Sequence, residues 1–79
     1  MKKKVGELPK INIEETEKNI SEYEEKLKVE ENADIIKELL ELYGKAIEFY
    51  SAINDKRYIE YNNKVRRILK NQKYTELIE

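Results

Sequence analysis

The stretch IIKELLELYGKAIEFYSAI, Ile35 to Ile53, decides the fold. With a turn of ~100° per residue, as in an α-helix, its large apolar side chains fall within one half of the helical circumference. The charged side chains fall within the other half. A half-circle of apolar surface is wider than one neighbouring helix covers. The stretch therefore predicts a central helix over 34–53 that packs against neighbours on both flanks.

A narrower apolar seam precedes this segment and predicts a helix over 13–29; its members are Ile13, Ile20, Tyr23 and Leu27, with Thr16 filling the gap. Asn12 with Glu15 forms a capping box that opens the helix. Glutamates that precede lysines by four residues, such as Glu24 before Lys28, are expected to stabilise its surface.

A third apolar face predicts a helix over 56–70; it consists of Tyr58, Tyr61, Val65, Ile68 and Leu69. Residues 71–79 leave two interpretations open, an extension of this helix with a shifted phase or a short separate turn. The connections are only a few residues long, which favours antiparallel neighbours. No alternating run of strand length is present.

The predicted fold is therefore all-α, a small antiparallel three-helix bundle (up-down-up) with the second helix in the centre. It forms one domain over 12–79, preceded by a flexible tail over 1–11 that holds the only proline.

Composition narrows the class of function. The chain has 79 residues, a net charge of −1, and no Cys, His or Trp. A core this small usually needs a disulfide, a metal or a partner chain, and the first is excluded by the missing cysteines. General acid–base catalysis needs a histidine or desolvated carboxylates, and no Gly-rich phosphate loop is present. We therefore expect no enzymatic activity, catalytic residue, cofactor, metal site or small-molecule substrate.

The start of the chain, MKKKV, is not followed by the apolar region of a secretory signal. No run approaches the ~20 apolar residues of a membrane span. The sequence predicts a soluble, cytoplasmic protein without a membrane span.

Gly44 lies inside the central helix, where glycine costs ~1 kcal/mol relative to alanine. It is either a tolerated surface glycine or, with Ser51, part of a strip that a partner helix can approach closely. The six tyrosines are either core-edge residues or the lining of a groove, since tyrosine is enriched at binding hot spots. The candidate partner-binding residues are Leu40, Gly44, Ile47, Tyr50, Ser51, Tyr58 and Tyr61.

Charge is unevenly distributed along the chain, since residues 56–79 carry seven basic and three acidic side chains. A basic face on the third helix could contact phosphates while nearby tyrosines stack on bases. The residues for such contacts are Lys56, Arg57, Lys64, Arg67 and Lys70. The other interpretation is a solvated face that complements the acidic central helix. Nucleic-acid binding is therefore the less favoured alternative.

The segment LLELYGKAIEFYSAI, Leu39 to Ile53, resembles the middle helix of the microtubule-interacting-and-transport module; the matching residues are Leu39, Leu42, Tyr43, Ala46, Ile47 and Tyr50. It is also similar to tetratricopeptide helices. The module is a three-helix bundle that binds tail peptides in its grooves, although it usually has alanines where this chain has Ile20 and Tyr23. The resemblance implies a peptide- or protein-binding role. We therefore expect an interaction module, either an adaptor or a small accessory subunit, whose partner is another protein or a second copy in a homodimer.

Overall fold

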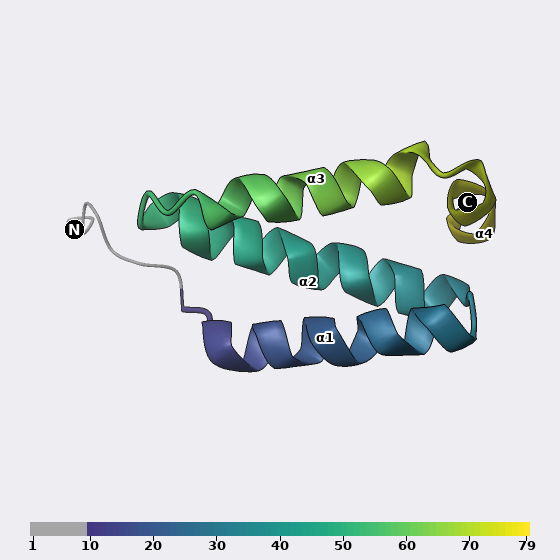
Figure 1. The fold of residues 1–79 in the computed structure, drawn as a ribbon, viewed down its shortest axis with the longest axis horizontal. Helices are drawn as coiled ribbons and strands as arrows, with labels where there is room; N and C mark the ends of the chain where they lie inside the picture. The colour runs from purple at the N-terminus through teal and green to yellow at the C-terminus, as the bar shows by residue number, and fades with distance from the viewer. Residues whose placement is uncertain (1–9) are drawn as a thin grey trace, which may run out of the picture.

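The computed structural model describes residues 10–79, and all regular structure within them is helical, which confirms the predicted all-α class. The four helices are α1 (Ile13–Val29), α2 (Ala33–Ala52), α3 (Arg57–Lys70) and α4 (Gln72–Ile78). The first three lie along the long axis, and α4 crosses one end (Figure 1). The predicted tail over 1–11 lies, except for its last two residues, outside the described residues.

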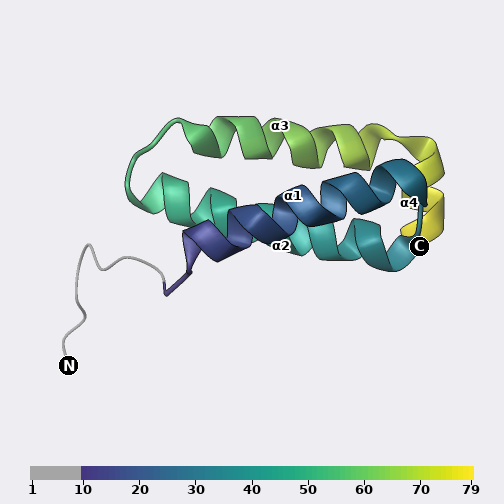
Figure 2. The same cartoon turned by 60° about the horizontal axis from the view of Figure 1, so that its bottom comes forward.

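The middle position belongs to α2, which packs against α1, α3 and α4. Figure 1 shows α1 and α3 on different sides of it, and in the turned view of Figure 2 α1 passes in front of α2. No Cα atom of α1 lies within 8 Å of a Cα atom of α3. Most fully buried apolar side chains come from α2; they are Ile36, Leu39, Leu42, Tyr43, Ala46 and Tyr50, joined by Ile20 and Ile68. The core is therefore a strip along α2 that the flanking helices share.

Asparagines begin three of the helices. Asn12, Asn32 and Asn71 each accept a hydrogen bond from a backbone N–H of the first turn, at 3.1, 2.7 and 3.2 Å. Such caps are worth about 1 kcal/mol. The three-helix expectation differs from the structure at Asn71, whose extended backbone (ψ 108°) ends α3 and whose side chain starts α4. Residues 72–78 are therefore a short separate helix.

The apolar arc of α2 is not covered evenly. Ile47 is partly exposed and is not packed against the core cluster, and Ile53 is 40% exposed. Leu69, which the sequence placed on the packed face of the third helix, is 53% exposed. The reason is that α3 faces the part of the arc that carries Tyr43 and Tyr50, so side chains beyond that part keep contact with solvent.

Candidate functional site

Three glutamates spaced seven residues apart, Glu17, Glu24 and Glu31, bond α1 and the connection after it to the other helices. Glu17 and Glu24 both lie on α1 and point in nearly the same direction, differing by only ~20°, whereas Glu31 lies in the connection after it. Each carboxylate accepts a hydrogen bond from at least one tyrosine hydroxyl. We call this set of contacts the carboxylate ladder.

At the first rung, the Glu17 carboxylate accepts hydrogen bonds from the hydroxyls of Tyr50 (2.6 Å) and Tyr61 (3.0 Å). The two phenol rings are stacked with centroids 6.1 Å apart. The Arg57 guanidinium lies 4.7 Å from the Tyr50 ring centroid and is held by Asp55 at 2.8 Å. Burial, together with the hydrogen bond to Glu17, raises the pKa of Tyr50 to about 12. The tyrosines therefore serve here as neutral donors.

At the second rung, the Glu24 carboxylate accepts hydrogen bonds from the Tyr43 hydroxyl (2.6 Å) and the Lys64 ammonium (2.8 Å). Burial acts to raise the pKa of Glu24, but the bonds from Lys64 and Tyr43 outweigh it and hold the pKa below its usual range. The predicted ion pair between Glu24 and Lys28 does not form, because Glu24 is taken by the other helices. Lys28 instead lies 3.2 Å from Glu25.

The third rung lies at the end of the molecule that α4 crosses. The Glu31 carboxylate accepts hydrogen bonds from the Tyr74 hydroxyl (3.1 Å) and forms an ion pair with Lys73 (2.7 Å). The hydrogen bond from Lys73 holds the pKa of this exposed carboxyl below its usual range. Glu31 thus fastens the connection between α1 and α2 to α4.

The ladder shows which groups the α2–α3 pair presents to α1. Its side toward α1 presents neutral hydroxyl donors and cations, which are the complement of a helix with carboxylates at heptad spacing. The groove residues are Tyr43, Tyr50, Arg57, Tyr61 and Lys64. Sequence reasoning named Tyr50, Tyr61, Arg57 and Lys64 as candidates for other contacts and missed their arrangement around the glutamates, although Tyr43 and Tyr50 share the seven-residue spacing of the glutamates.

The seven predicted partner-binding residues fall into two groups. Tyr50 and Tyr61 belong to the ladder and face α1. The other five lie toward the opposite edge of the α2–α3 pair, which we call the outer edge; they are Leu40, Gly44, Ile47, Ser51 and Tyr58. The position of these residues follows from the rotation of side chains around α2. Leu42 lines a hollow shared with α1, and Tyr43 faces α3. The outer-edge residues of α2 lie beyond Tyr43 in the same direction around the helix, away from α1.

The outer edge is open at its centre. No atom lies within 4 Å of the position that a Cβ of Gly44 would occupy. The Ser51 hydroxyl is exposed and donates to the Glu48 carbonyl at 3.3 Å. Leu40 and Tyr58 are partly buried against the core cluster, whereas Ile47 is not. The edge is therefore apolar, uncharged and incompletely covered.

The five predicted phosphate-binding residues also divide. Lys64 of α3 is engaged by Glu24 of α1, whereas Arg57 pairs locally with Asp55 and lies over the Tyr50 ring of α2. The other three are exposed, and Arg66, which the sequence interpretation left out, is exposed beside them; this outward set is Lys56, Arg66, Arg67 and Lys70. Some of the basic side chains of α3 therefore form contacts within the protein, and the others point to solvent.

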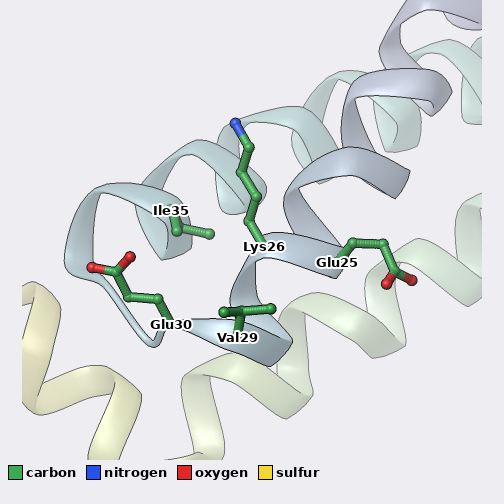
Figure 3. Close-up of a pocket in the computed structure, with 5 residues that line it drawn as sticks. All are labelled: Glu25, Lys26, Val29, Glu30 and Ile35. Atoms are coloured by element: carbon green, nitrogen blue, oxygen red, sulfur yellow. The ribbon is translucent and has the colours of Figure 1, made fainter.

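A shallow hollow lies where α1 meets α2 (Figure 3); it is lined by Glu25, Lys26, Val29, Glu30 and Ile35. Val29 is 88% exposed, more than any other large apolar residue of the described chain. Among residues 10–79, no cluster of three or more Asp or Glu side chains is arranged to hold a metal ion.

No protein-family model matches the chain, and neither curated proteins nor solved structures give a significant match. The resemblance to the microtubule-interacting-and-transport module and to tetratricopeptide helices therefore stays a prediction. No helix within residues 10–79 is both long enough and apolar enough to cross a membrane.

Proposed function

We propose that the protein is a non-enzymatic helical interaction module, an adaptor or small accessory subunit that binds a helix of another protein. In this proposal α1, α2 and α3 act as an antiparallel up-down-up unit with α2 central, and α4 braces one end. The contacts of α2 with all three other helices support this arrangement. The molecule then offers the partner the side of the α2–α3 pair that α1 does not cover.

The observation that carries the proposal is the incomplete cover of the outer edge. Ile47 is partly exposed beside the open space over Gly44. Leu69 lies three helical turns after Tyr58 on the same side of α3 and is 53% exposed. An amphipathic helix docks its apolar face through anchors at i, i+3, i+4 and i+7, which suits an apolar edge of this kind. The glycine lets its backbone approach closely.

Selection from a displayed library of amphipathic helical peptides tests the proposal. Peptides enriched on the parent chain are expected to lose at least about tenfold in affinity for Ile47→Lys, since a charge would then face their apolar side (about 1.4 kcal/mol per tenfold). Ala52→Lys is the matched control, because Ala52 is exposed on another face of the same helix. Circular dichroism confirms that both variants fold.

A different result rejects the proposal. If no selected peptide distinguishes Ile47→Lys from Ala52→Lys, the outer edge is not a binding surface.

One observation favours a second function: none of the four outward cations, Lys56, Arg66, Arg67 and Lys70, forms an ion pair within residues 10–79. Binding of nucleic acid along α3 is therefore the alternative.

A further inference from the structure

α1 is attached to α2 by an apolar seam and to the other groups of the bundle by polar side chains. Of its seventeen residues only Thr16 and Ile20 are buried, and Ile13, Tyr23 and Leu27 are partly buried against the core. Its link to α3 consists of hydrogen bonds between side chains, from Tyr61 to Glu17 and from Lys64 to Glu24. All the groups in these bonds are carried by side chains of the helices, so the same helix from a second copy could remake every one of them. A helix that is to replace α1 against α2 and α3 must carry carboxylates at the positions of Glu17 and Glu24, and the α1 of a second copy meets this requirement.

The connection between α1 and α2 is short and can become helical. It consists of Glu30, Glu31 and Asn32, with neither glycine nor proline. Glu30 and Asn32 have extended backbones (ψ 117° and 139°), and the helical region is equally allowed to both residue types. Glutamate is a good helix former. If these three residues adopt helical angles, residues 13–52 form one continuous helix and α1 points away from its own groove.

Two contacts hold the connection in its present conformation. The Asn32 side chain caps α2 through the Asp34 N–H at 2.7 Å. Glu31 is bound to Tyr74 and Lys73 of α4. The side chains of Glu31 and Lys73 are 38% and 66% exposed, so dissolved salt weakens the attraction between them.

Apolar side chains at the connection remain without cover in the single chain. Val29 is almost fully exposed and lines the same hollow as Ile35 (Figure 3). In a twofold dimer the two extended helices pass each other at the connection, where these side chains of both copies can meet. Short hinges of this kind favour exchange of an element between copies.

We propose that α1 exchanges between two copies of the chain, the α1 of each copy occupying the groove between α2 and α3 of the other. The partner is thus a second copy, recognised by carboxylates at heptad spacing against tyrosines and Lys64. The exchange uses the opposite side of the α2–α3 pair from the outer edge, so it holds or fails independently of the proposed function.

Charge reversal across the second rung tests the exchange. Glu24→Lys and Lys64→Glu each place like charges together within one chain. In an exchanged dimer of the two variants, each α1 instead meets an opposite charge on the other chain. The variants are mixed in urea, refolded together and weighed by light scattering. We expect a dimer of one copy of each, twice 9.5 kDa in mass, that melts above either variant alone.

The doubly substituted single chain, Glu24→Lys with Lys64→Glu, is the control for the reversed pair. If it folds and the mixture still behaves as the sum of its components, the exchange does not occur. A dimer built on any other surface would not depend on which chain carries which charge. Heterodimer formation by parent mixed with the doubly substituted chain, which pairs like charges across copies, is expected to be suppressed.

A second measurement decides the question even if the reversed pair does not fold. Glu31→Ala releases the connection from α4 and is expected to raise the dimer fraction above that of the parent. Glu22→Ala is the matched control, because Glu22 is exposed on α1 and forms no ion pair within residues 10–79. If Glu31→Ala and Glu22→Ala both stay at 9.5 kDa at every concentration, the exchange is refuted.

Discussion

The Glu24 carboxylate and the Lys64 ammonium lie 2.8 Å apart, although the two helices that carry them have no Cα atoms within 8 Å of each other. The side chains of Lys64 and Tyr61 reach from α3 to α1, and the Tyr61 ring lies beside that of Tyr43 of α2, with centroids 5.9 Å apart. Helix pairs usually meet through aliphatic side chains at interaxial distances of 8–10 Å. Here the interface between α1 and α3 is aromatic and hydrogen-bonded instead.

Substitutions at Leu39 and Ile47, which both belong to the apolar arc of α2, should lower the free energy of unfolding by unequal amounts. Leu39 is fully buried, so Leu39→Ala should lower the free energy of unfolding by about 2–5 kcal/mol. Ile47→Ala should cost no more than about 1 kcal/mol, because a partly exposed side chain loses only part of its transfer free energy. Urea unfolding measures both. Equal losses would show that Ile47 is packed as tightly as Leu39.

The second rung predicts energetic coupling between Tyr43 and Glu24. A double-mutant cycle of Tyr43→Phe and Glu24→Gln should give a coupling of about 1 kcal/mol, the usual net value of one hydrogen bond. Tyr58→Phe is the control, since the Tyr58 hydroxyl has no hydrogen-bond partner among residues 10–79. Urea unfolding of the four chains of each cycle gives the values. Coupling of the same size with Tyr58 would mean that the 2.6 Å contact between Tyr43 and Glu24 carries no specific energy.

Alkaline pH should unfold the protein through its ladder tyrosines. Burial first, and the glutamate bonds second, raise the pKa of Tyr50 from 10.0 to about 12 and raise those of Tyr43 and Tyr61 further. A raised pKa in the folded state means that the stabilisation is complete below pH 10 and is lost as the pH rises through the folded values. Loss of helical circular dichroism should therefore accompany formation of tyrosinate above pH 10. A helix signal that persists after every tyrosine has ionised would contradict this.

Gly44 predicts a gain in stability. Because the space over it is open, Gly44→Ala should stabilise the free chain by up to about 1 kcal/mol through helix propensity. Thermal unfolding measures the gain. Gly44→Leu should also fold but should weaken binding of peptides selected on the outer edge, since its side chain would occupy the approach of a partner helix. Peptide binding that is unchanged in Gly44→Leu would place the partner elsewhere.

Nucleic-acid binding can be tested without disturbing the fold. A variant that exchanges Arg57 or Lys64 is unsuitable, because Lys64 bonds to α1 and Arg57 lies over the Tyr50 ring of α2. Exchanging Arg66, Arg67 and Lys70 for glutamine removes outward charge only. We expect the parent chain not to bind DNA or RNA tightly. If it does, and if the triple variant lowers the slope of binding against salt by about one per lost contact, the alternative function replaces the leading one.

Local pattern predicted the helices well. The ranges expected from the sequence were 13–29, 34–53 and 56–70, and those observed are Ile13–Val29, Ala33–Ala52 and Arg57–Lys70. These ranges follow from periodicity and from asparagine caps, which act within a few residues. Asn71 could either continue a helix or cap a new one, so the sequence left α4 open. The position of Ile47 and Leu69 could not be predicted, because the rotation of α3 about α2 decides which edge of the apolar arc is covered.

The candidate site was harder to foresee. The sequence interpretation assigned the glutamates of α1 to pairs along its own surface and the tyrosines to the edge of the core. In the structure Glu17 and Glu24 bond across to other helices instead. Whether a glutamate bonds along its helix or across depends on how far the neighbouring helices stand apart, and no local pattern states that distance. The shared spacing of seven residues was the available signal.

The even spacing of the ladder has a consequence for the register of α1. A slide by seven residues would carry Glu24 to the place of Glu17 and Leu27 to the place of Ile20, both chemically acceptable. It would also carry Tyr23 into the slot of Thr16, which is only 6% exposed and holds a far smaller side chain. Thr16, a residue that neither bonds in the ladder nor belongs to the apolar core, therefore blocks this slide sterically.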